Sequence, residues 1–102
     1  MKPYLSVYGH ISIDQIVSLA DFPQMNTSVD ILSKQTKLGG TGTNIAVTAA
    51  SLGVPTAICG FVGNDFPKIF EDFMRSKDLI MDEMVKVEME KKLVLLVVVE
   101  VV

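Results

Sequence analysis

The sequence predicts an α/β fold in which strands and helices alternate around a mostly parallel sheet. Two short apolar runs, residues 4–8 and 56–59, end at a glycine, as is common for buried strands. Two other segments, residues 45–52 and 66–73, place apolar residues at helical spacing. The order of strand, helix, strand and helix is typical of a parallel, doubly wound sheet.

The first third of the chain is predicted to be extended. A strand over residues 4–8 ends in a turn, and extended chain resumes over residues 11–19. Pro23 and its neighbours interrupt this segment, because proline and aspartate favour turns. A further strand is expected over residues 28–33, and the chain then enters a glycine-rich turn at residues 39–43.

The first helix is expected directly after this turn. Its apolar positions recur at helical spacing: Ile45, Ala46, Ala49 and Leu52. Thr41 or Thr43 can cap the start of the helix, because a hydroxyl oxygen there accepts a free backbone N–H. Gly53 suits the left-handed residue that ends a helix, and Pro55 prevents its continuation.

The second helix is expected after the short buried strand at residues 56–59, which Gly60 ends. Asn64 or Asp65 can cap this helix. Four aromatic or aliphatic residues would then give it one apolar face: Phe66, Ile69, Phe70 and Phe73.

The last eighteen residues differ in composition from the rest of the chain, since eight of them are valine. Residues 85–90 alternate between apolar and charged side chains, and residues 93–102 are apolar apart from one glutamate. Valine favours strands, so this segment predicts one or two strands with Lys91-Lys92 at the turn or edge between them. The segment carries no residues that indicate chemistry.

Composition excludes several classes of function. Nine basic and twelve acidic residues give a net charge of −3, which argues against a nucleic-acid-binding surface. One cysteine and one histidine rule out an internal disulfide, a thiolate metal cluster and a multi-histidine metal site. The N-terminus does not read as a signal peptide, and no apolar run approaches the ~18 residues of a membrane helix. A cytoplasmic protein without a membrane partner is therefore expected.

The glycine-rich turn is the first candidate binding feature. Glycines before a helix allow close backbone approach, and the helix dipole adds partial positive charge. The run at residues 39–44 has neither the Lys-Ser/Thr pair of a P-loop nor the third glycine of the dinucleotide fingerprint. Taken alone, it is equally well explained as a plain tight turn.

Asp14 and Asn44 are the second candidate feature. Asp14 follows the first strand, near the strand end where open α/β sheets bind ligands. The two side chains could accept and donate hydrogen bonds to the hydroxyls of a small polyol. The alternatives are that Asp14 is a solvated turn residue and that Asn44 is a second helix cap.

Together these residues resemble the N-terminal part of the PfkB, or ribokinase-like, family of carbohydrate and nucleoside kinases. The resemblance covers residues 4–84 and rests on the family's first signature: Gly39, Gly40, Gly42, Asn44, Ala46, Gly53 and Gly63. Residues 60–65 resemble the family's Gly-x-Val-Gly-x-Asp stretch, and residues 9–14 resemble its first-strand motif. The resemblance implies part of a ribokinase-like three-layer fold, with a mostly parallel sheet, helices and small β lid strands.

The resemblance also implies a substrate site. The residues expected to hold or border hydroxyls of a sugar or nucleoside are Ser12, Asp14, Gly40, Thr41, Gly42 and Asn44. Ser12 and Thr41 stand where ribokinases proper have asparagine and lysine, so the sugar or nucleoside itself is open. Lid strands at about residues 16–36 would cover the acceptor and form a homodimer contact. Family members transfer the γ-phosphate of ATP, with Mg²⁺, to a hydroxyl.

The resemblance assigns residues 1–102 to the N-terminal, substrate-binding part of a ribokinase-like domain, with an atypical valine-rich tail at about 85–102. The family's second signature, with its catalytic aspartate, anion hole and ATP site, has no counterpart, and no Gly-Asp pair occurs. We therefore expect the chain alone to be inactive, with ATP and Mg²⁺ bound outside it. The alternatives are a non-catalytic polyol- or nucleoside-binding module and an engineered or structural α/β fragment.

Other polar and sulfur-containing residues are expected to be structural or solvated. His10 would be structural or exposed, Cys59 a core residue, and Asp21 and Asp30 solvated turn residues. The acidic residues of the second half would form a solvent-exposed helix face: Glu71, Asp72, Asp78, Asp82 and Glu83. Five methionines would fill the core or an interface: Met25, Met74, Met81, Met84 and Met89.

Overall fold

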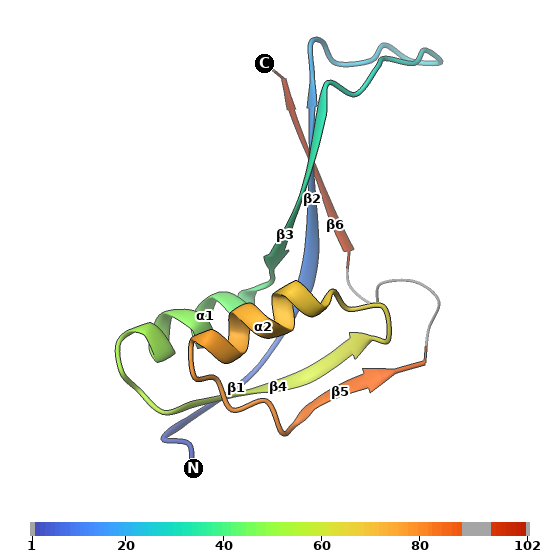
Figure 1. Ribbon diagram of the computed structural model, residues 1–102. Coiled ribbons are helices and arrows are strands. Elements are labelled where there is room, and N and C mark those ends of the chain that lie inside the picture. The colour runs from blue at the N-terminus through green and yellow to red at the C-terminus, as the bar shows by residue number, and fades with distance from the viewer. Residues whose placement is uncertain (1, 89–94, 102) are drawn as a thin grey trace.

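The computed structural model describes residues 2–88 and 95–101. In these residues six strands form two three-stranded sheets, and two helices accompany them (Figure 1). The elements follow one another in this order: β1 Leu5–Tyr8, β2 Ser12–Leu19, β3 Ser33–Gly39, α1 Thr41–Ser51, β4 Thr56–Gly63, α2 Lys68–Ser76, β5 Met84–Val87 and β6 Leu95–Val101. The α/β class and the mostly parallel pairing are confirmed.

The first sheet, which we call the body sheet, has the strand order β1-β4-β5, and all its pairings are parallel. Its order advances in one direction only, so right-handed crossovers place both helices on the same face (Figure 1). A doubly wound sheet needs a reversal of strand order, and the described residues contain none. These three strands therefore do not test the doubly wound prediction.

The core lies between the body sheet and the helices. Ala46 of α1 and Met74 of α2 pack with Val7, Ile58 and Val62 of the strands, and all five are buried. The opposite face of the sheet carries no helix in the described residues, and three of its large side chains are exposed: Tyr8, Phe61 and Val85. Cys59 pairs with Tyr8 across β1 and β4, so it lies on this face and is half-buried rather than in the core.

The N-cap residues of both helices differ from those that the sequence suggested. The N-cap of α1 is Gly40, with Thr41 already inside the helix, and no side chain caps this end. The N-cap of α2 is Pro67, whereas Asn64 and Asp65 lie in the preceding turn. Proline suits this place because it needs no N–H partner at the start of a helix.

The apolar face predicted for α2 is only partly buried. Phe66 is buried but precedes the helix, and Ile69 and Phe73 are exposed. Met74 is the buried residue of this helix. The helix packs on the core through Met74 and Phe70, which lie four residues apart.

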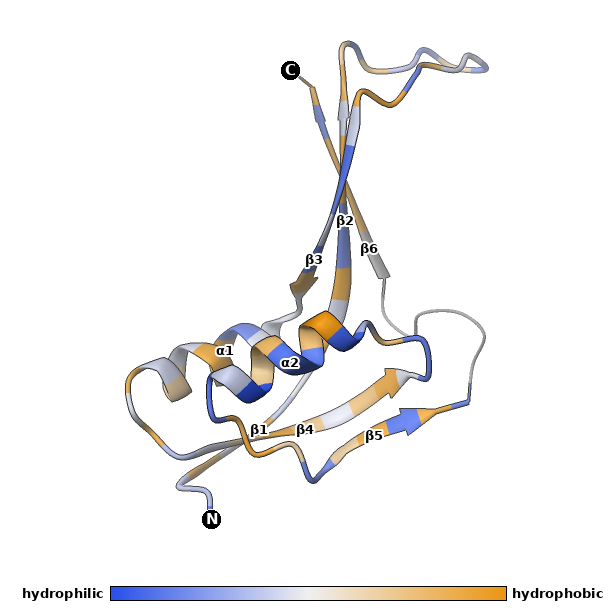
Figure 2. Ribbon diagram, in the orientation of Figure 1, coloured by the Kyte–Doolittle hydropathy of each residue, from blue (hydrophilic) through white to orange (hydrophobic). Residues whose placement is uncertain are grey.

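The second sheet, which we call the lid, stands away from the body sheet (Figure 1). Its strand order is β3-β2-β6, with β2 and β3 antiparallel and β2 and β6 parallel. The strand expected over residues 28–33 is wrong, because residues 28–32 lie in the exposed β2–β3 loop and β3 spans Ser33–Gly39. Figure 2 shows that β3 is mainly hydrophilic, whereas β6 is mainly hydrophobic.

The valine-rich tail contributes one strand to each sheet. β5 pairs with β4, and β6 pairs with β2, so the two predicted strands form in separate sheets. β5 is shorter than the expected strand over residues 85–90. Lys91-Lys92 and Met89 lie outside the described residues. Similarly, β4 does not end at Gly60 but continues to Gly63, with Gly60 paired to Met84.

One ion pair joins the second helix to the edge of the body sheet. Lys86 Nζ of β5 lies 2.5 Å from Glu71 Oε1 of α2, whose side chain is only 13% exposed. Glu71 is therefore not part of a solvent-exposed acidic face, although its neighbour Asp72 is exposed and pairs with Lys68.

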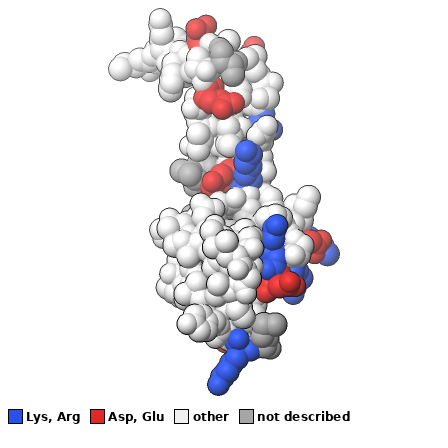
Figure 3. Space-filling view, turned by 90° about the vertical axis from the view of Figure 1, so that its left-hand side faces the viewer, with Lys and Arg blue, Asp and Glu red and all other residues white. Residues whose placement is uncertain are grey.

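Acidic and basic side chains alternate on the molecular face in Figure 3, which shows no broad patch of one sign.

The methionines behave differently from one another. Met74 is fully buried, Met81 and Met84 pack against the core, and Met25 is exposed in the β2–β3 loop.

Within the described residues, neither helix has the length and hydropathy that a membrane span requires.

Candidate functional site

The candidate site forms where the chain passes from the body sheet into the lid. The link between β1 and β2 crosses the start of α1, and the His10 carbonyl accepts hydrogen bonds from the N–H groups of Gly42 and Thr43, at 3.0 and 3.3 Å. The His10 side chain itself is exposed. The backbone of His10 thus fastens the base of the lid to the first turn of the helix.

Two glycines of the signature are required by this crossing. A Cβ atom on Gly42 would lie 2.8 Å from the carbonyl carbon of Gly9. Gly40 has a φ of +98°, and a Cβ atom there would lie 2.3 Å from the His10 carbonyl oxygen. Both contacts are with backbone, which cannot move aside cheaply. The glycines therefore serve close packing of backbone on backbone.

This geometry limits what the helix N-terminus can do. An anion at such a terminus is held by free N–H groups. Here the N–H groups of Gly42 and Thr43 are bonded to the His10 carbonyl, and that of Asn44 is bonded to Gly40. The turn therefore joins the lid to the body, and these three amides are not free to hold a phosphate.

Asp14 lies inside a strand, so the alternative that it is a solvated turn residue is wrong. It is the third residue of β2 and is half-buried. Its Oδ1 atom accepts a hydrogen bond of 2.8 Å from the hydroxyl of Ser12, which is 4% exposed. Its Oδ2 atom lies only 2.1 Å from the position that a Cβ atom on Gly39 would occupy. Ser12, Gly39 and Asp14 therefore form one contiguous cluster.

Gly39 is the functional candidate that the sequence did not single out. It belongs to the glycine-rich run, but its contact with Asp14 follows from the β2–β3 pairing, in which Ser12 stands opposite Gly39. Antiparallel pairing of the two segments was the signal that could have located it. The sequence alone did not supply their register.

Asn44 is the fourth residue of α1 and is exposed, so it is not a helix cap. Its side chain makes no hydrogen bond within the described part of the chain and is available to a ligand. It lines a cavity of about 300 Å³ beside α1, and the other lining residues are Leu38, Thr43, Val47, Thr48 and Phe73. Thr43 is 2% exposed, and its hydroxyl has no hydrogen-bond partner. Thr41 is exposed at the start of the helix.

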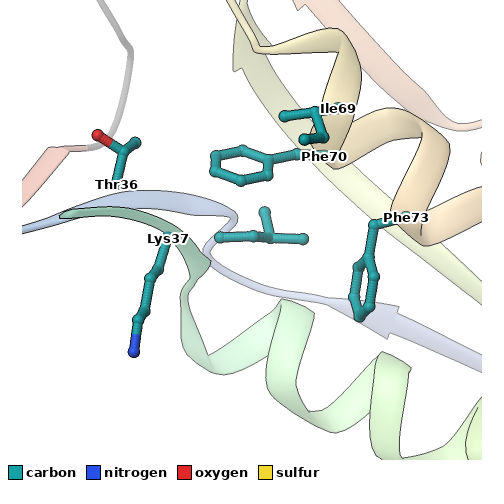
Figure 4. Close-up of a pocket in the computed structure, with 6 residues that line it drawn as sticks. Thr36, Lys37, Ile69, Phe70 and Phe73 are labelled. Carbon is teal, nitrogen blue, oxygen red and sulfur yellow. The ribbon is translucent and has the colours of Figure 1, made fainter.

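A second cavity, of about 340 Å³, lies between β3 and α2. It shares Leu38 and Phe73 with the first, and Figure 4 shows Ile69 and Phe70 approaching from the helix. Thr36 and Lys37 point to opposite sides of the lid in the same view. Lys37 stands opposite Asp14 in the hairpin, and paired residues share a face. This mainly apolar cavity is lined by Lys37 as well as by Thr36 and Leu38 of β3.

The remaining candidates are dispersed. Asp21 and Asp30 are exposed in the β2–β3 loop. The described residues contain no group of three or more His, Cys, Asp or Glu side chains that could hold a metal ion. The amides of Gly42, Thr43 and Asn44 are already bonded, so these three do not fit the phosphates of ATP.

Comparison with known proteins gives one consistent result. The family model described as pfkB family carbohydrate kinase matches residues 2–101. A nucleoside kinase of Methanothermobacter thermautotrophicus is 31% identical over 84 residues, which are 81% of this chain and 27% of that protein.

Solved structures agree with the sequence match. The crystal structure of Methanocaldococcus jannaschii nucleoside kinase, an archaeal member of the ribokinase family, superposes with a TM-score of 0.78 at 31% identity, covering 86% of this chain and 30% of that one. The structure of Arabidopsis thaliana ribokinase complexed with ribose and ATP has a TM-score of 0.73 at 26% identity, covering 86% and 29%. The chain thus spans less than a third of the length of these relatives.

Proposed function

Because the chain belongs to the pfkB family of carbohydrate kinases, we propose that it is the acceptor-binding part of a sugar or nucleoside kinase. The complete enzyme would transfer the γ-phosphoryl group of ATP to a hydroxyl of the acceptor, in the cytoplasm. The single observation that carries the assignment to this part of the chain is the Asp14 carboxylate, which Ser12 and Gly39 hold at the base of the lid.

The chain's own residues bind and orient the acceptor. The Asp14 carboxylate keeps acceptor capacity beyond its bond to Ser12, so it can take hydrogen bonds from sugar hydroxyls. Asn44, with its exposed amide, can donate to one hydroxyl oxygen and accept from another. Gly40 and Gly42 allow the base of the lid to lie close to the start of α1.

The phosphoryl-transfer machinery would come from elsewhere. ATP supplies the transferred group and Mg²⁺ neutralises its developing charge, and catalysis depends mainly on positioning and on electrostatic stabilisation. The contribution of the chain would be to position the acceptor, through Asp14 and Asn44.

Replacing Asp14 by asparagine should weaken acceptor binding at least about tenfold, because a hydrogen bond to a charged group contributes roughly 1.5–3 kcal/mol. Isothermal titration calorimetry of the chain with ribose, fructose and nucleosides measures this. Asp21→Asn is the matched control, since it removes the same charge from an exposed loop position and should leave affinity unchanged. Equal affinities of the wild type and Asp14→Asn for the bound acceptor would contradict the proposal.

The 102-residue chain should bind an acceptor but transfer no phosphate. It contains no Gly-Asp pair, and therefore no counterpart of the family's catalytic aspartate. An ADP-release assay with ATP, Mg²⁺ and each acceptor checks this expectation, and turnover above the protein-free rate would contradict it. A longer reading frame with a Gly-x-Gly-Asp motif would favour the kinase over a binding module.

We also propose a homodimer through the lid. Lys34 and Lys37 protect the β3 edge against strand pairing, whereas the opposite edge strand, β6, exposes Val97 and Val99. Light scattering should therefore give about twice the monomer mass. Val99→Lys should reduce this mass to that of a monomer, and Ile69→Lys on α2 should not. A strictly monomeric wild type at high concentration would overturn this arrangement.

A further inference from the structure

We infer that Ser12 and Gly39 are positioning residues that hold the Asp14 carboxylate away from Lys37 and keep it available to the acceptor. The expected effect on acceptor affinity rests on the proposed function, but the placement of the carboxylate can be tested without any ligand. Ser12 then acts through Asp14 and does not itself bind the acceptor.

Asp14 has two competing partners in the lid. It stands directly opposite Lys37 in the β2–β3 hairpin, where oppositely charged side chains commonly form a cross-strand pair. Both side chains belong to the described residues, and no ion pair joins them there. Instead the carboxylate turns toward the base of the lid, where it meets Ser12 and Gly39.

Ser12 provides the attraction toward the base. Its hydroxyl donates to Asp14 Oδ1 at 2.8 Å, and the residue is 4% exposed. A hydroxyl so far removed from water has its single proton committed to the carboxylate. Its loss would leave Asp14 with no hydrogen-bond donor from this side of the strand.

Gly39 provides the space. The carboxylate lies where the side chain of residue 39 would begin, with Oδ2, the carboxyl carbon and Oδ1 at 2.1, 2.5 and 2.7 Å from an ideal Cβ. All three atoms belong to one flexible side chain, in contrast to the backbone atoms that face Gly40 and Gly42. Alanine at position 39 is therefore compatible with the fold, but it requires Asp14 to move, and Lys37 is the charged partner across the strand.

The experiment compares wild type, Ser12→Ala and Gly39→Ala, with thermal unfolding as the check on folding. Three-bond NMR couplings report the χ1 rotamer of Asp14 in the chain without ligand, and calorimetry reports affinity for the acceptor that binds the wild type. We expect one χ1 rotamer in the wild type, a different or averaged rotamer in both variants, and an affinity reduced about five- to tenfold.

The double variant Ser12→Ala/Lys37→Met separates positioning from a general structural effect. Removal of the competing ammonium should restore part of the affinity lost in Ser12→Ala, which mere damage to the fold would not allow. An unchanged Asp14 rotamer in both single variants would overturn the inference. So would a changed rotamer with unchanged affinity, in the presence of a clear loss for Asp14→Asn.

The two proposals fail in different ways. If the wild type binds none of the acceptors, the proposed function fails, and the rotamer measurement alone decides whether Ser12 and Gly39 position the carboxylate. If Asp14→Asn loses affinity while Ser12→Ala and Gly39→Ala keep it, the proposed function stands and the positioning role is wrong.

Discussion

Gly40→Ala should unfold the chain or destabilise it by at least about 2 kcal/mol, because a non-glycine residue in such a conformation costs roughly 1–3 kcal/mol and overpacking adds a similar amount. The φ angle of Gly40 is +98°, and the added Cβ would overlap the His10 carbonyl oxygen at 2.3 Å. That oxygen also accepts the first hydrogen bonds of α1, so it cannot withdraw without loosening the helix start. Chemical denaturation followed by circular dichroism measures the effect.

Gly53→Ala is the matched control. Gly53 also has a positive φ, +87°, but nothing lies within 4 Å of the Cβ that alanine would add. Only the conformational term remains, and it costs roughly 1–2 kcal/mol. If the two variants lost equal stability, the close approach of the lid link to α1 would not be the reason for Gly40.

Met74→Ala should have the second-largest effect, a loss of about 2–5 kcal/mol, as is usual when a buried methionine is truncated. Met74 is fully buried beneath α2, where it packs with the apolar side chains of the body sheet. The melting temperature should fall by roughly 8 °C or more, since about 1 kcal/mol corresponds to roughly 4–8 °C in a domain of this size.

Ile69→Ala on the same helix provides the comparison. Ile69 is 72% exposed, so its truncation removes little buried area and should change stability by less than about 0.5 kcal/mol. The helical periodicity places Ile69 on the predicted apolar face, whereas the structure buries Met74. Similar losses for the two variants would show that α2 packs as the periodicity suggests and not as the structure describes.

Local signals were sufficient for much of the fold. Three features depend on φ/ψ preferences and on hydrophobic spacing within a few residues: the glycine-rich run, the helix that ends before Gly53 and Pro55, and the apolar strand that follows. The same run carried the family resemblance, which the match over residues 2–101 confirms. The strand expected at residues 28–33 failed because a β-prone segment becomes a strand only when another strand pairs with it.

In the candidate site, too, some residues could be named from local sequence and others depend on strand pairing. Asp14, Asn44 and the signature glycines could be named from the sequence, because they belong to a contiguous motif or to a residue type suited to hydroxyls. Gly39 and the bond from Ser12 to Asp14 could not, since both depend on how β2 pairs with β3.

The sequence by itself determined the α/β class, the order of the central elements and the kinase family, because these follow from short-range spacing and a local motif. Only the tertiary structure decided that β5 and β6 belong to different sheets, that both helices cover one face, and that Asp14 turns from Lys37 toward Gly39. Each of these depends on contacts between segments far apart in the chain, and a local pattern does not encode which segments meet.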